Sequence, residues 1–74
     1  MANELKIGNK VVFNYDINLD EDNVNDRAIE GSQGIITDID EKSDYPYYVE
    51  FNNSNGTKDT RVFNNNDISL IEDK

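Results

Sequence analysis

The chain has 74 residues, of which 16 are acidic and 7 basic, so its formal net charge is −9. A chain of this length buries roughly 60% of its unfolded surface on folding, which predicts one small domain over residues 1–74 without room for a deep catalytic cleft. Cysteine and histidine are absent, which excludes disulfides, thiolate or imidazole metal sites, and Cys/His or Ser/His nucleophilic catalysis. We therefore expect a protein that is not an enzyme and that needs no cofactor.

The hydropathy and charge of the sequence also indicate where the protein is located and whether it binds nucleic acid. The sequence contains no long apolar run, so we expect neither a signal peptide nor a membrane span, and a cytoplasmic protein. The acidic excess opposes direct binding to nucleic acid, because that binding depends on Lys and Arg displacing counterions from phosphates.

The first predicted strand covers residues 11–15, where Val11, Phe13 and Tyr15 alternate onto one face. The acidic stretch at residues 16–33 lacks a periodic apolar pattern, so we predict a long ordered loop. Its apolar residues would hold that loop against the sheet. They are Ile17, Leu19, Val24 and Ile29.

Two further strands are predicted at residues 34–39 and 47–51. Gly34 begins the former, and a glycine there permits a close backbone approach or the positive φ of a bulge. The latter alternates cleanly and places Tyr47, Val49 and Phe51 inward.

The last part of the chain predicts a hairpin and a closing strand. Residues 53–56 contain Asn55 and Gly56, which tolerate the left-handed backbone of a tight turn. A strand at residues 57–63, a turn at residues 64–67 and a short strand at residues 68–71 follow. The predicted core consists of Val11, Phe13, Ile36, Val49, Phe51, Val62 and Leu70.

This order of five short strands, with a long loop after the first, resembles that of SH3-like small β-barrels. Residues 6–13 and the Gly34-x-Ile36 pattern resemble the opening and second strand of these barrels. Residues 45–51 and 63–68 are similar to the SH3-like E subunit of photosystem I and to mind-bomb-type SH3-like repeats. The resemblance implies an all-β, five-stranded SH3-like barrel with a long acidic loop after strand 1. The absence of tryptophan departs from the SH3 domains that bind polyproline.

Most of the negative charge lies in one part of the sequence. Residues 16–50 hold eleven acids and two bases, a net charge of −9, whereas the remaining residues balance. In an SH3-like barrel the loops after the first strand and after the second flank one groove, with the Asn55-Gly56 hairpin at the far end. We therefore expect the acids to gather on one face, where they would attract a basic partner. The alternative is that acidic loops only keep a small protein soluble.

Residues 16–22 place oxygen-bearing side chains at alternate positions, as an EF-hand calcium loop does. The comparison fails because position six would be Glu21 instead of glycine and position twelve would be Arg27 instead of a bidentate glutamate. We expect no metal site.

Exposed tyrosines among acids would suit a protein interface, because they add apolar area and a hydrogen bond at small entropic cost. The sequence therefore predicts a protein-binding module whose partner has a basic surface. The predicted contact residues are Tyr15, Asp16, Asp20, Glu21, Asp22, Asp26, Glu30, Glu41, Asp44, Tyr45 and Tyr48.

The 12 asparagines and 8 isoleucines are typical of AT-rich genomes, and small acidic proteins of this kind include phage proteins that block one host protein. We expect a monomeric inhibitor in the host cytoplasm. It would act as a nucleic-acid-mimicking decoy or as a wedge in an oligomer interface. The alternative, which the resemblance to the photosystem I protein implies, is an accessory structural component that stabilises a larger protein complex.

Overall fold

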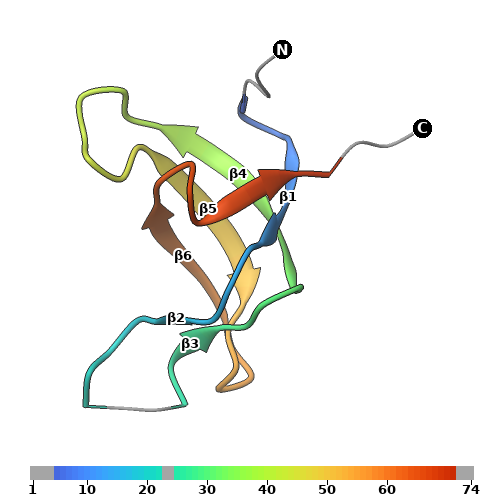
Figure 1. Ribbon diagram of the computed structural model, residues 1–74, viewed down its shortest axis with the longest axis vertical. Coiled ribbons are helices and arrows are strands. Elements are labelled where there is room, and N and C mark those ends of the chain that lie inside the picture. Colours follow the sequence, from blue (N-terminus) through green and yellow to red (C-terminus); the bar gives the residue numbers. More distant parts are fainter. Residues whose placement is uncertain (1–4, 23–24, 72–74) are drawn as a thin grey trace.

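The computed structural model describes residues 5–22 and 25–71, and this part of the chain is all-β (Figure 1). The strands are β1 (Lys10–Phe13), β2 (Ile17–Asn18), β3 (Arg27–Ala28), β4 (Gln33–Ile39), β5 (Tyr47–Asn52), β6 (Lys58–Phe63) and β7 (Ile68–Leu70). The described residues include no helix long and apolar enough to cross a membrane. The prediction of an all-β protein is confirmed.

Five of the strands form one antiparallel sheet in the order β6-β5-β4-β1-β7, and β2 pairs with β3 in a separate hairpin. β6 and β7 are the two edges of the large sheet and do not pair with each other. The sheet, as far as the chain is described, is therefore open, whereas the sequence predicted a closed barrel.

The core lies on one face of the large sheet. Its centre is a cluster of Phe13, Phe51 and Phe63, whose rings meet edge to face with centroids 5.0–5.7 Å apart. Edge-to-face contact aligns the positive edge of one ring with the negative face of the next, which stabilises the cluster beyond the area that it buries. Val11, Ile36 and Val49 complete this layer and are almost wholly buried.

Val62 on β6 was predicted to belong to the core, and this prediction is wrong. Its side chain is 43% exposed, and the adjacent Phe63 is buried instead. Successive strand residues point to opposite faces, so only one of this apolar pair can enter the core, and Phe63 completes the aromatic cluster. Leu70 is only partly buried at the core margin, and Ile68, the first residue of β7, is the buried core residue of this strand.

The first strand ends earlier than predicted. β1 stops at Phe13, and the chain bends over residues 14–15. Tyr15 consequently does not continue the inward face of Val11 and Phe13, and its side chain is 46% exposed.

The predicted long loop at residues 16–33 contains the hairpin β2–β3. Ile17 pairs with Ala28, and the amide of Leu19 donates to the carbonyl of Asp26 at 2.9 Å. Ile17 and Leu19 pack against the core as expected, and Ala28 is fully buried. Two-residue strands are too short to leave an alternating pattern, which explains why the sequence did not reveal them. Val24 lies outside the described residues.

Gly34 is required by a close approach of β4 to β5. A Cβ at this position would lie 2.5 Å from Val49 Cγ1 and 2.9 Å from the carbonyl oxygen of Glu50. The register between β4 and β5 shifts between Ile36 and Asp38, so a bulge lies further along the strand. The prediction of a close approach at Gly34 is confirmed, and the bulge is displaced from it.

The predicted turn near Asn55 and Gly56 is confirmed between β5 and β6, and Gly56 has a φ of 94°. Its predicted location is wrong. The amide of Ser54 donates to the carbonyl of Arg27 at 3.0 Å, so this turn is anchored to the β2–β3 hairpin (lower end of Figure 1) instead of lying far from it.

Candidate functional site

A groove of about 340 Å³ lies between β2 and the C-terminal half of β6. Ile17, Asn18 and Leu19 line one side of it. Arg61, Val62 and Phe63 line the other side, and Tyr45 and Asp67 complete the lining. The groove therefore joins residues from the segment after β1 and from the β4–β5 connection, as the sequence predicted for these two loops.

Tyrosine hydroxyls and apolar carbons are both accessible at this groove. Tyr45 is 49% exposed and Val62 is 43% exposed. Tyr15 lies beside the groove, since its hydroxyl donates a 2.5 Å hydrogen bond to Oδ1 of Asp67. Among the predicted contact residues, Tyr15 and Tyr45 are thus brought close to the same groove.

The Tyr15 hydroxyl has an altered acidity. Its hydrogen bond to the Asp67 carboxylate, together with partial desolvation and the nearby negative charge of Asp67, raises the pKa of Tyr15 above 10.0. The phenol therefore stays protonated and continues to donate to Asp67 at physiological pH. Asp67 is itself held by the turn before β7, where its Oδ2 accepts from the amide of Asn64 at 3.1 Å.

Two predicted acids brace the base of the β2–β3 hairpin. Asp16 Oδ2 lies 4.0 Å from a guanidinium nitrogen of Arg27, and Asp16 Oδ1 accepts a 2.8 Å hydrogen bond from the amide of Glu30. Both groups of the ion pair are well exposed, so it contributes little to stability. The carboxylates of Asp16 and Glu30 remain accessible to a partner.

Asp26 has a structural role that the sequence did not predict. It is only 8% exposed, accepts a short hydrogen bond from the side-chain amide of Asn53, and pairs with Arg61 at 3.4 Å. Asn53 also donates to Asp59 at 2.8 Å. Asp26 was predicted to contact a partner, but these contacts instead fasten the β2–β3 hairpin to the β5–β6 hairpin.

The remaining predicted acids form two exposed loops. Asp20, Glu21 and Asp22 lie at the tip of the β2–β3 hairpin, where the amide of Asp22 donates to Oδ1 of Asp20 at 2.9 Å. Glu41 and Asp44 lie in the β4–β5 connection. Figure 1 places these two loops at opposite ends of the long axis of the molecule. The acids thus lie in two separate loops instead of forming one continuous cluster (Figure 1).

Tyr48 does not line the groove, although its partner on β6, Val62, does. It is half-buried on β5, opposite Asp38 on β4 and opposite Val62 on β6. Tyr47 packs partly against the core, as predicted.

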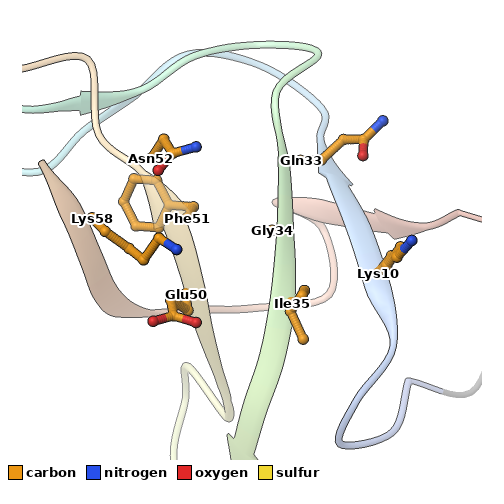
Figure 2. A pocket seen from close by; sticks show the side chains of 8 residues that line it. All are labelled: Lys10, Gln33, Gly34, Ile35, Glu50, Phe51, Asn52 and Lys58. Atoms are coloured by element: carbon orange, nitrogen blue, oxygen red, sulfur yellow. The ribbon is translucent and has the colours of Figure 1, made fainter. Parts of the chain in front are cut away.

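A second hollow, of about 200 Å³, lies on the outer face of the large sheet and is shown in Figure 2. Its charged residues are Lys10, Lys58 and Glu50, and none of the predicted contact residues lines it. Two ammonium groups and one carboxylate give this hollow no attraction for a basic partner. Of these two hollows, the groove beside β2 and β6 is therefore the better candidate for the predicted interface.

Of the eight residues that line the groove, only Tyr45 was a predicted contact residue. Arg61 and Val62 belong to β6, where the face of each residue depended on the strand register, and Asp67 follows a turn that gave no functional signal. The exposed valine in a strand next to a core phenylalanine was the one available indication.

Within the described ranges, no three acidic side chains converge as metal ligands would. A side-chain oxygen of Asp16 accepts a hydrogen bond from the backbone amide of Glu30, and one of Asp20 accepts from that of Asp22. The arrangement supports molecular recognition through carboxylates, phenols and apolar carbons.

Comparison of the chain with protein-family models, with curated proteins and with solved structures gives no match in any of the three.

Proposed function

We propose that this chain is a small acidic module that binds one protein through the groove between β2 and β6, and that blocks the basic surface of that protein. The observation that carries the proposal is the position of exposed Tyr45 and Val62 at a groove whose lining includes residues from both acidic connections, the segment after β1 and the β4–β5 connection. Apolar and phenolic groups supply contact area, and the carboxylates steer a basic partner toward it.

The architecture that we propose is an SH3-like domain with an open edge. Five principal strands, a tight turn between β5 and β6, and a further turn before β7 support this arrangement. The hairpin β2–β3 occupies the place of the long acidic loop after the first strand.

Blocking would occur by occlusion. The acidic loops would occupy a nucleic-acid-binding surface of the partner as a decoy, or the domain would enter an oligomer interface of the partner. In a phage setting this partner would be a host protein. A decoy is expected to compete with DNA or RNA for the partner, and a wedge is expected to change the partner's oligomeric state.

The test begins with capture from a lysate of the cell in which the protein acts, followed by mass spectrometry. The wild type is compared with the double variant Asp20→Asn, Asp22→Asn, which preserves the hairpin hydrogen bond acceptors while removing two charges. The matched control is Asp38→Asn, Glu50→Gln, which removes two charges from β4 and β5.

Association kinetics then decide the outcome for the captured protein. Surface charges act over about 8 Å at physiological salt, so the hairpin variant is expected to bind more slowly, with a weaker dependence on salt, while the control binds as the wild type does.

Tyr45→Ala is expected to speed dissociation, because anchors act mainly on that rate. Equal binding by all variants would contradict the proposed interface. Higher stability of the partner without loss of its activity would indicate an accessory structural component instead.

A further inference from the structure

β6 is an edge strand, and its pairing with β5 shows which of its backbone groups are free. The amide of Asn53 donates to the carbonyl of Thr57 at 2.7 Å across the β5–β6 turn. Hydrogen-bonded and non-hydrogen-bonded pairs alternate along an antiparallel ladder, so Asp59, Arg61 and Phe63 bond to β5. The backbone groups of Lys58, Thr60 and Val62 therefore point away from the sheet.

The open edge of β6 is next to the groove. β6 is an edge of the large sheet, and no turn or loop hydrogen bond between backbone groups of the described residues involves Thr60 or Val62. The C-terminal half of β6 lines the groove directly, and β2 lines the opposite side. An unpaired strand edge beside a groove is a template on which an extended segment can pair.

Building on the proposed function, we propose that the partner contributes an extended segment that pairs with β6 as an additional strand, with an apolar side chain against Val62 and Tyr45 and with Lys or Arg side chains toward the acidic loops. Backbone hydrogen bonds to Thr60 and Val62 would supply affinity, and the groove would select the side chains.

The charge of the molecule favours a basic segment over a second copy. Arg61 is paired with Asp26, and Arg27 lies next to Asp16, so both bases near the groove already face a carboxylate. Asp20, Asp44 and Asp67 have no ion pair among the described residues. Pairing β6 with β6 of another copy would bring together two chains that each carry a net charge of −9.

The outer-face hollow of Figure 2 does not provide an equivalent site. Its walls consist of side chains on paired strands, with Lys10 and Lys58 on either side of Gly34. The strands β4 and β5 beneath it are bonded to neighbours on both sides, so they offer no free edge.

The probe for this proposal is an acetylated and amidated octapeptide of alternating Lys and Val. An octapeptide of alternating Lys and Pro has the same charge but lacks every second backbone amide, so it is the control ligand. In NMR titrations of the full chain, the Lys-Val peptide is expected to shift the amides of Lys58, Thr60 and Val62 saturably. It is also expected to slow hydrogen exchange at Thr60 and Val62 about tenfold, and the Lys-Pro peptide is expected to do neither.

A backbone variant separates strand pairing from side-chain contact. The chain is synthesised with an ester in place of the amide of Val62, which removes the outward N–H and keeps the valine side chain. The control is the same replacement at Leu70. The amide of Ile71 donates to Lys10, so by the same alternation Leu70 points outward on the opposite edge of the sheet.

The Val62 ester is expected to weaken binding of the Lys-Val peptide about threefold to tenfold, as loss of one hydrogen bond does, while the Leu70 ester leaves it unchanged. Salt-sensitive binding of both peptides with no change at the β6 amides would overturn strand pairing and leave acid-directed protein binding intact. Concentration-dependent shifts at β6 without peptide would identify a second copy as the occupant and also overturn the proposal. If neither peptide binds, strand pairing is wrong, and the capture experiment tests the proposed function independently.

Discussion

Tyr15 and Asp67 are 52 positions apart in the sequence but share a hydrogen bond beside the groove. The proton on Tyr15 is retained in the folded state because the neighbouring carboxylate accepts from it and repels the phenolate. The hydrogen bond also joins the segment after β1 to the turn before β7.

Replacement of Asp67 by Asn is expected to lower the pKa of Tyr15 toward its ordinary value of 10.0, because the negative charge is lost. The raised pKa means that the folded state holds this proton more tightly than the unfolded state does. The stability that it contributes is present below pH 10.0 and is lost as the pH rises through the raised pKa. Titration followed by tyrosinate absorbance measures the shift, with Tyr15→Phe to assign it. An unchanged titration in Asp67→Asn would contradict the assigned cause.

Asn53 is the residue on which the junction of the two hairpins depends. Its side chain bonds to Asp26 and Asp59 and accepts from the amide of Arg27 at 3.0 Å. Asn53→Ala is expected to lower the free energy of unfolding by about 1–3 kcal/mol, because it leaves the buried Asp26 carboxylate without its amide donor. Urea unfolding measures this, and Asn52→Ala at the exposed neighbour is the control. Equal losses in both variants would show that Asn53 has no special role.

The hydrogen bond between Asn53 and Asp59 makes Asp59 an unsuitable control position for charge reversal. From the sequence, reversal of its charge should have little effect on partner binding, because it lies outside the acidic segment. Asp59 accepts from Asn53, so its reversal also perturbs the hairpin junction. Asp38 and Glu50 are better controls for charge because neither takes part in that junction.

Among the elements, β4 packs closely against β5 only because residue 34 is a glycine. Gly34→Ala is expected to destabilise the protein by about 1–3 kcal/mol, since overpacking forces shifts in well-packed neighbours. The carbonyl oxygen of Glu50 belongs to the backbone of β5 and cannot rotate away from the new methyl group. Thermal or urea unfolding checks the prediction, with Thr37→Ala as an exposed control on the same strand. A Gly34→Ala variant as stable as the wild type would show that the strands separate easily here.

The β2–β3 hairpin contributes to both parts of the proposed interface. Its buried side packs Ile17, Leu19 and Ala28 on the core, while its tip presents Asp20 and Asp22 to solvent. The same element therefore positions one wall of the groove and one set of the charges that we propose to steer a partner. Its attachment through Asp26 and Asn53 keeps that wall in register with β6.

For the whole molecule, the three phenylalanines of the aromatic cluster are almost wholly buried at the centre of the core. Phe51→Ala is expected to lower the free energy of unfolding by about 3–5 kcal/mol, because it removes a buried ring that contacts both other phenylalanines. This is a large share of the stability of a small domain. The measurement is equilibrium unfolding, and Val62→Ala, at the exposed position on β6, is the control and should cost much less. A melting temperature unchanged in Phe51→Ala would contradict the described core.

The amino-acid pattern alone predicts the strands that alternate clearly and the turns that contain Asn and Gly. The strand at residues 47–51, the strand beginning near Gly34 and the turn at Asn55-Gly56 were all predicted closely, because their signals are local. The exposure of Tyr45 and its place beside the segment after β1 were also anticipated.

Strand pairing in the folded chain selects which of Val62 and Phe63 enters the core, because both are apolar and a shift of one residue exchanges the two faces of a strand. The burial of Asp26 with Asn53 and Arg61 also depends on tertiary contacts. The sequence does not distinguish Asp26 from the exposed acids, because its hydrogen-bond donors lie far away along the chain. The open edge of β6 is likewise invisible in the sequence. Whether a strand is an edge depends on the pairing of all the others, and that pairing is a long-range property of the folded chain.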